Sequence, residues 1–552
     1  MSTPSVRSAS RRAEKFGLPP VVLACTAIGV AFLATRLLLV WRFPPFLDEA
    51  RHAAWTVQGF EDIHYRFISL TNGKEPLLTW LGMGWMLLGA EPLTAVRLVS
   101  VASGLVTVVM VGLIARHFWG DRVGVVAAAL CAVLPFFVVH DAIGIMESLV
   151  TAAAMCALYL QIRFAAQPAL DLALLLGFAL AAGLLTKETG QFALVLLPLS
   201  LLCFGWRRRP GVGARLAAWV GGAALALLMA GIGYSILMLS DYWDDLGTAR
   251  RAIDMHRPVG EALSRPWQYA GENAPLFVEA LAGYVTVPLL LLFVLGAVVA
   301  LRDRPPPAAL LLGWALFPLA TAFLLAYVAY PRYIVIAVPP IVVFVALGLV
   351  RLWEWTAARQ GTVVATAAAV LLAVPALVFD SRVVADPAGF RYPALDDEQF
   401  ATGWTAGRAW EDVADELERR AGSRPTFVQL GERNSPALEL LLRDRPNIRL
   451  TTGSHPLGPA AAYAIENGDT LSGRDGLLDL RPVWETRRPR GGTALRLLVR
   501  GPVWEGRFYS TPDDLRAGLG LPDPKFDAFL ASHPEVLAWY RAWYGALSAG
   551  AR

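Results

Sequence analysis

Two adjacent carboxylates follow the first long apolar segment of the chain. Asp48 and Glu49 stand in the sequence Phe-Leu-Asp-Glu-Ala-Arg at 46–51, where a membrane helix would meet water. Charged groups at such a position are costly to leave without a partner, so the pair predicts a functional site. A carboxylate within hydrogen-bond reach of a hydroxyl or amine can take its proton, and Asp48 is the candidate for this base. The alternative is an acid that only caps a helix at the membrane surface.

Other polar residues stand near the ends of later apolar segments. Lysine and arginine there can stabilise the negative charge of a departing phosphate, and a further carboxylate can orient a second reactant. Each also has a simpler interpretation, as a membrane-surface anchor, a helix-dipole partner or a helix-end ion pair. The residues of this set are Lys74, His140, Asp141, Glu147, Lys187, Arg332 and Tyr333.

The order of these motifs resembles that of membrane glycosyltransferases with lipid-phosphate sugar donors. The chain is similar to the protein O-mannosyltransferases and lipid A aminoarabinose transferases of the glycosyltransferase C superfamily. Lys74 in Lys-Glu-Pro-Leu resembles the family's Lys-Pro-Pro-Leu, with Glu75 in place of the first proline. Leu-Thr-Lys followed by Glu188 resembles the family's Leu-Thr-Lys-Gly, and Tyr-Pro-Arg-Tyr at 330–333 resembles its Arg-Tyr motif.

Two further segments extend the resemblance. His140 and Glu147 stand roughly where the family has an arginine and then an aspartate, and Asp141 is a spare acid there. The segment 396–407, with Gly-Trp-Thr-Ala-Gly, resembles a signature with Gly-Trp-Pro-Ser-Gly in many bacterial members. The resemblance therefore extends over the whole membrane part and the beginning of the polar tail.

The resemblance implies transfer of a sugar from a polyprenyl phosphate to a lipid, glycan or protein acceptor, by direct displacement with inversion. Asp48 would be the base, Glu49 its helper or a metal ligand, and Glu147 a second catalytic acid. Substrate contacts are implied for the other polar residues of the set. No cofactor is implied with certainty, and a divalent metal held by Asp48 and Glu49 stays open.

The composition describes the elements that must position these residues. Of 552 residues, 56% are hydrophobic and 17% are charged, well below the charged share of soluble domains. Apolar blocks long enough to cross a bilayer, such as those at 93–115 and 276–301, predict a polytopic α-helical membrane protein with about eleven transmembrane helices. Basic residues in the short loops place the N-terminal tail, 1–18, in the cytoplasm. Residues 19–379 form the predicted membrane domain.

Two long loops, 42–92 and 240–275, interrupt the membrane domain on its outer side. The second contains several cations beside aromatic residues, Arg257 among them. Such a mixture suits a lid over a lipid-linked sugar, because phosphates pair with arginine and sugars stack on aromatic rings. An interfacial loop with an aromatic belt is the alternative.

An odd number of spans places the tail, 380–552, outside the membrane, opposite the N-terminus. A helical pattern at 409–420 and four short strand patterns predict an α/β domain there. The strand patterns are at 425–430, 448–450, 462–465 and 494–499, and a last helical pattern lies at 522–547.

Among other classes of protein, the sequence disfavours one and leaves two open. Scattered basic residues and a net charge of +4 give little support for nucleic-acid binding. A transporter or flippase of a lipid-linked sugar is the main alternative, although transporters favour charges near the bilayer midplane on broken helices. A non-catalytic assembly protein is a third hypothesis, after the glycosyltransferase and the transporter. The predicted location is a bacterial-type inner membrane.

Overall fold

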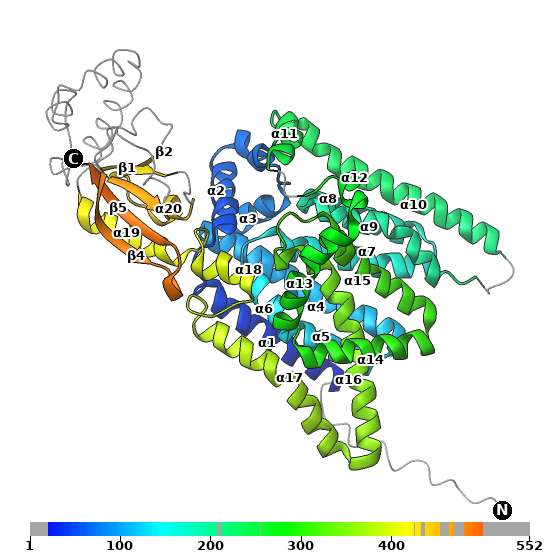
Figure 1. Cartoon of the computed structure of the whole chain (residues 1–552). Helices are drawn as coiled ribbons and strands as arrows, with labels where there is room; N and C mark the ends of the chain where they lie inside the picture. Colours follow the sequence, from blue (N-terminus) through cyan, green and yellow to red (C-terminus); the bar gives the residue numbers. More distant parts are fainter. Residues whose placement is uncertain are drawn as a thin grey trace, which may run out of the picture.

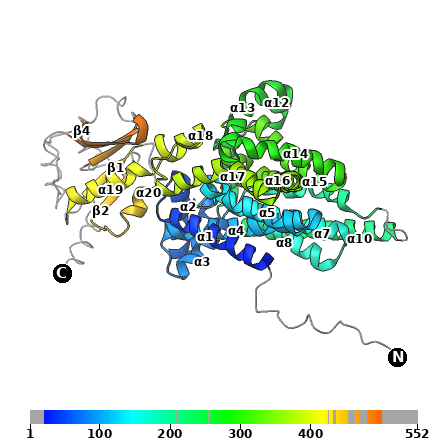
Figure 2. The ribbon, with the colours of Figure 1, turned by 90° about the horizontal axis from the view of Figure 1, so that it is seen from below.

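The computed structural model describes residues 20–206, 211–253, 256–423, 426–431, 436–452, 463–468 and 480–500. A large body of helices fills most of the molecule, and a small sheet with its helices lies at one end (Figure 1). The view from below separates the same two parts, with α2 on the side of the helical body that faces the sheet (Figure 2).

Seven of the described helices, with their 3-10 extensions, are long and apolar enough to cross a membrane, and a bent pair can make an eighth. The predicted eleven spans also included shorter apolar segments, namely α5 (Asp121–Val133) with α6 (Pro135–His140), α8 (Leu170–Thr186), and the run η3 (Glu188–Gln191), α9 (Phe192–Val195) and η4 (Leu197–Cys203). Each single helix of this group has at most 17 residues, fewer than the about 20 that a full crossing usually needs. The seven helices are α1 (Pro20–Val40), α4 (Pro92–Trp119), α7 (Met146–Ala166), α10 (Val212–Ser235, continued by η5, Ile236–Leu239), α15 (Pro305–Leu325), α16 (Val338–Gln360, preceded by η6, Pro331–Ala337) and α17 (Thr362–Ala385).

The bent pair consists of α13 (Pro266–Tyr284) and α14 (Val287–Asp303), whose axes differ by 102°. Thr286 between them has a φ of 73°, and Pro288 cannot donate the backbone hydrogen bond that would continue a helix. The predicted span at 276–301 therefore begins inside α13 and passes through the bend. The expected loop 240–275 contains α11 (Trp243–Ile253) and α12 (Val259–Ser264) as well.

The expected first outer loop, 42–92, is also mostly helical. It contains α2 (Leu47–Glu61), η1 (Ile63–Tyr65), η2 (Ile68–Asn72) and α3 (Leu77–Leu87). Gly73 ends η2 with a φ of 69°, a conformation that favours glycine. The chain therefore turns sharply just before Lys74.

Helix α16 forms the centre of the helical body. Its first ten residues are all buried, and they include Pro339 and Pro340 within the first turn, where the missing N–H groups do no harm. Gly296 of α14 and Gly348 of α16 face each other so closely that a Cβ on either would meet the other helix's backbone. Small residues thus let two membrane helices pack tightly.

The small domain holds a five-stranded mixed sheet in the order β2-β1-β3-β5-β4. Strand β1 pairs in parallel with β2 and β3, and β5 pairs antiparallel with β3 and β4. Strand β4 was not predicted, because Pro482 and several charges interrupt its pattern. The predicted helix 522–547 lies outside the described residues. The elements are α18 (Ala394–Asp397), η7 (Glu398–Thr402), α19 (Arg408–Ala421), β1 (Thr426–Leu430), α20 (Pro436–Leu441), β2 (Ile448–Thr452), β3 (Tyr463–Asn467), β4 (Leu480–Arg487), η9 (Pro489–Gly491) and β5 (Ala494–Arg500).

The small domain packs directly on α2. Ala50 of α2 belongs to the same buried cluster as the apolar side chains of α19, α20 and the sheet. The Leu47 N–H donates to the Thr405 carbonyl at 3.2 Å, and Arg443 pairs with Glu61 at 2.8 Å. The helix that begins with Asp48 is therefore held between the two parts of the molecule.

Candidate active site

The two adjacent acids at the start of α2 have different surroundings. Glu49 is fully buried, and its Oε1 accepts a hydrogen bond from the Phe46 N–H at 2.9 Å, which closes the first turn of the helix. Arg97 of α4 grips both carboxylate oxygens, at 2.5 and 2.9 Å, and the Gly144 N–H donates to Oε2 at 2.8 Å. Glu49 thus fastens α2 to α4 and to the turn before α7.

Asp48 lines a cavity that is bounded by α2, α7 and η6 among other elements, whereas Glu49 does not line it. Its Oδ2 accepts a hydrogen bond from Arg332 Nη2 at 2.8 Å, and its side chain is 36% exposed. Burial opposes ionisation, but the charges of Arg332, Arg51 and Lys74 outweigh it and lower the pKa of the Asp48 carboxyl. Asp48 is therefore an ionised carboxylate that faces open space.

Arg332 joins two of the three acids that were predicted to be catalytic, Asp48 and Glu147. Besides Asp48, its Nε lies 3.6 Å from Glu147 Oε1, and its Nη1 donates to Gln399 Oε1 at 2.8 Å. Lys187 Nζ binds the same Glu147 oxygen at 2.6 Å. Glu147 is thus neutralised by two cations and its side chain is only 5% exposed, which leaves Asp48 the more accessible carboxylate.

The cavity between these side chains has a volume of about 440 Å³. Elements far apart in the sequence supply its wall: α2, the turn after η2, the starts of α7 and η3, α11, α15 and η6. This size lies within the ordinary range of small-molecule sites. The charged residues on its wall are Asp48, Arg51, Lys74, Glu75, Glu147, Lys187, Glu188, Arg250 and Arg332, with His52 and His256 beside them.

Lys74 lies on the cavity wall as a partly buried cation. Within the described part of the chain, no carboxylate lies within ion-pair distance of its ammonium group. Burial and the nearby Lys187 lower the pKa of the Lys74 ammonium. A cation without a carboxylate partner at a cavity wall is suited to bind an anion.

Tyr333 completes the set of predicted residues at the cavity. Its ring lies below the Lys187 ammonium, with the nitrogen 5.3 Å from the ring centre. The geometry is that of a cation–π contact, which helps to hold the lysine at the cavity wall. Six of the predicted site residues thus meet here: Asp48, Lys74, Glu147, Lys187, Arg332 and Tyr333.

His52 was not singled out from the sequence, although it follows Asp48 by one helical turn and so shares its face. Its side chain lines the cavity and is 4% exposed, and its Nδ1 has no hydrogen-bond partner among the described residues. Burial lowers the pKa of this imidazole to about 4. A neutral histidine therefore stands beside the ionised aspartate.

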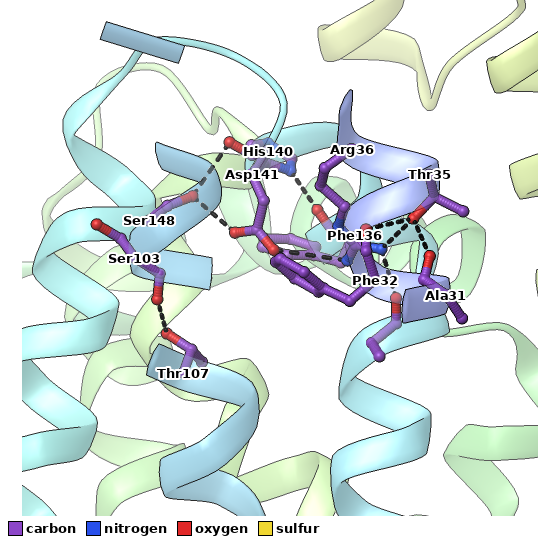
Figure 3. Close-up of polar contacts among 11 residues, drawn as sticks. Ala31, Phe32, Thr35, Arg36, Ser103, Thr107, Phe136, His140, Asp141 and Ser148 are labelled. Carbon is purple, nitrogen blue, oxygen red and sulfur yellow. Dashed lines mark hydrogen bonds and ion pairs between the residues drawn. The ribbon is translucent and has the colours of Figure 1, made fainter. Parts of the chain in front are cut away.

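His140 and Asp141, predicted as substrate contacts, lie instead in a separate buried cluster (Figure 3). Asp141 accepts a hydrogen bond from Ser148 at 2.8 Å and lies 3.5 Å from Arg36 of α1. Gly104 of α4 makes room for this carboxylate, since a Cβ there would lie 2.4 Å from it. His140 Nδ1 contacts the Phe136 carbonyl at 2.7 Å. Neither residue lines the cavity.

Arg257, also predicted as a substrate contact, is held by the protein. Its Nη1 donates to the Ala326 carbonyl at 2.6 Å, and its guanidinium lies over the rings of Tyr269 and Tyr327. Glu272 pairs with it at 3.2 Å. Arg257 therefore fixes the middle of the 240–275 segment against α13 and the end of α15, and it does not line the cavity.

The arrangement does not fit a metal site built on Asp48 and Glu49. Both oxygens of Glu49 already accept hydrogen bonds from Arg97 and backbone N–H groups. Across the described ranges, no group of three or more His, Cys, Asp or Glu side chains stands close enough to hold a metal ion. We therefore derive no step through a metal.

Comparison with known proteins supports the fold. ArnT from Cupriavidus metallidurans in the apo state aligns with a TM-score of 0.59 at 16% identity, over 86% of this chain and 97% of that one. The same protein bound to undecaprenyl phosphate aligns with a TM-score of 0.58 at 17% identity, over the same 86% and 97%. A comparison with curated protein sequences gives no match.

Fold and site together define a polytopic membrane protein with a charged cavity at the ends of its helices. The family model described as dolichyl-phosphate-mannose-protein mannosyltransferase matches residues 73–233, which include Lys74, Glu147 and Lys187. The resemblance drawn from the motifs is confirmed over residues 73–233 by this family model, and the likeness to ArnT extends the shared fold over most of the chain.

Proposed function

We propose that this protein is a membrane glycosyltransferase that transfers a sugar from a polyprenyl-phosphate donor to an acceptor on the outer face of the membrane. The observation that carries the proposal is the pairing, in one cavity, of an accessible carboxylate with a lysine that has no acidic partner among the described residues. The carboxylate can take the proton of an acceptor, and the lysine can bind the phosphate of a donor. The undecaprenyl phosphate bound by the structurally similar ArnT supports a lipid-phosphate donor.

Asp48 acts as the base. Its Oδ2 is held by Arg332, whereas Oδ1 has no hydrogen-bond partner among the described side chains and can accept the proton of an acceptor hydroxyl or amine. As that proton moves to the carboxylate, the acceptor atom forms a bond to the anomeric carbon of the sugar. One displacement of this kind inverts the configuration and needs no covalent enzyme intermediate.

The donor phosphate leaves with the electron pair of the broken carbon–oxygen bond. Its added negative charge is stabilised by Lys74, with Lys187 and Arg332 nearby. Tyr333 orients Lys187 through its ring. Glu147 holds Lys187 and Arg332 in place and thereby shapes the cationic wall.

The test uses purified protein in detergent with a panel of polyprenyl-phosphate sugars and candidate acceptors. We expect release of polyprenyl phosphate with at least one donor, and loss of that release in Asp48→Asn. A flippase would instead move the intact lipid-linked sugar across a liposome membrane without releasing phosphate. That outcome would overturn the transferase proposal.

A further inference from the structure

One arginine joins the two lysine-bearing segments of the cavity. Glu75 follows Lys74 and Glu188 follows Lys187, and the side chain of Arg250 from α11 binds both carboxylates. Its Nε lies 2.6 Å from Glu188 Oε1, and its Nη2 contacts Glu75 Oε1. We call these three residues the Glu75–Arg250–Glu188 triad.

The two acids of the triad stand where the chain departs from the motifs it resembles. Glu75 occupies the position of the first proline in Lys-Pro-Pro-Leu, and Glu188 occupies the position of the glycine in Leu-Thr-Lys-Gly. Each departure alone adds a negative charge next to Lys74 or Lys187, the two lysines of the cavity wall, which we call the anion site. Together with Arg250, they form one connected group.

Helix α11 is firmly attached where it supplies Arg250. Leu246 of α11 packs in a buried cluster with Leu70 of η2 and Leu237. Gly73 allows the close approach, since a Cβ there would lie 3.2 Å from the backbone nitrogen of Arg250. The position of Arg250 relative to the turn that carries Lys74 is therefore fixed by packing.

The members of the triad differ in burial. This difference shows which of the two carboxylates depends more on Arg250. The side chain of Glu75 is 3% exposed, that of Arg250 29% and that of Glu188 37%. Leaving a buried carboxylate without its cation is far more costly than leaving an exposed one. Loss of Arg250 should therefore act mainly through Glu75.

We infer that the Glu75–Arg250–Glu188 triad positions the anion site by holding both carboxylates away from the neighbouring lysines. Lys74 then keeps an ammonium group without a carboxylate partner among the described residues, and Lys187 keeps Glu147 as its partner. Arg250 is thus a positioning residue that acts through two lysines. The inference rests on the proposed function, because the anion is taken to be the donor phosphate.

The charge balance of the wall leads to the same expectation. Five cationic and four anionic side chains line the cavity, with the histidines left aside. Removal of Arg250 alone leaves equal numbers of both signs and frees Glu75 beside Lys74. An anion held by Lys74 should then bind more weakly, although Lys74 itself is unchanged.

The experiment measures binding of undecaprenyl phosphate to the purified full-length chain in detergent, together with donor kinetics. Arg250→Gln should weaken binding about tenfold and raise the donor KM with little change in kcat. The triple variant E75Q/E188Q/R250Q should recover most of the affinity, because a fully neutral set leaves no unpaired charge. Arg351→Gln, which breaks the exposed pair with Asp303, is the matched control and should bind as wild type.

The outcomes separate this inference from the proposed function. Wild-type protein that binds no undecaprenyl phosphate would overturn the donor assignment itself. If wild type binds and Arg250→Gln binds equally well, the triad does not position the site. If the triple variant is as weak as Arg250→Gln, the loss comes from packing of the arginine side chain, and the inference is also wrong.

Discussion

Replacing each of the adjacent acids Asp48 and Glu49 by its amide should change a different property. The Asp48 variant should lose activity, and the Glu49 variant should lose stability. Asp48→Asn keeps the shape of a side chain that is 36% exposed to the cavity, and Arg332 retains Gln399 and Glu147. Because only the proton acceptor is lost, sugar transfer should fall by about 10²–10⁴-fold. The unfolding temperature should stay close to that of wild type.

Glu49→Gln should do the reverse. The side chains of Glu49 and Arg97 are 0% and 3% exposed, so the variant leaves a buried guanidinium without its anion. Breaking such a pair from one side costs about 3–5 kcal/mol of stability. The lower end applies here, because Arg97 still donates to the Val40 carbonyl at 2.6 Å.

The assay pairs two measurements on each purified variant: release of polyprenyl phosphate at limiting donor, and the midpoint of thermal unfolding. Asp62→Asn, at the exposed end of the same helix, is the matched control for both. Near-normal transfer by a well-folded Asp48→Asn protein would refute the base assignment and make Glu147 the next candidate. Inactive but fully stable Glu49→Gln would show that Glu49 takes part in the chemistry.

Three more predictions follow from the site and the topology. Lys74→Ala and Arg332→Ala should each reduce kcat/KM for the donor by about 2–4 kcal/mol of transition-state stabilisation, and normal values in both would reassign them to membrane anchoring. Burial lowers the pKa of His52 from 6.5 to about 4, so between these values the unfolded chain binds a proton that the folded chain does not, and stability falls as the pH falls. His52→Asn should lose up to about 3 kcal/mol less than wild type on titration to pH 4 in denaturant melts, whereas parallel curves would contradict the burial argument. A reporter that works only outside the cytoplasm should be active when it is fused after Arg552. Activity of a reporter that works only in the cytoplasm would reverse the predicted orientation.

The membrane helices could be predicted because hydrophobic length is a local property of the sequence. The block expected at 93–115, for example, corresponds to α4, which extends to Trp119. The prediction of a loop at 240–275, where α13 begins, was wrong for the same reason. Its polar residues, such as Gln268 and Glu272, looked like a loop, and the bend after Tyr284 depends on a single threonine and a proline.

The six predicted residues that line the cavity meet because each stands at the end of a helix or in an adjoining turn. Asp48, Glu147, Lys187 and Arg332 come from four segments whose ends gather at one cavity. The sequence could not tell which of two neighbouring acids faces that cavity. For Asp48 and Glu49 the answer depends on Arg97, which is 48 residues away from Glu49.

The departures from the family motifs show most clearly what a local comparison leaves out. Taken singly, Glu75 in place of proline and Glu188 in place of glycine each weaken the case for the lysine beside it. The structure joins both acids through Arg250, a residue more than 60 positions beyond either motif. An acid beside an anion-binding lysine is tolerable only where a cation elsewhere holds it, so the two substitutions and the arginine form a single feature. The cationic wall of this cavity thus depends on helix α11 as much as on the motifs that carry its lysines.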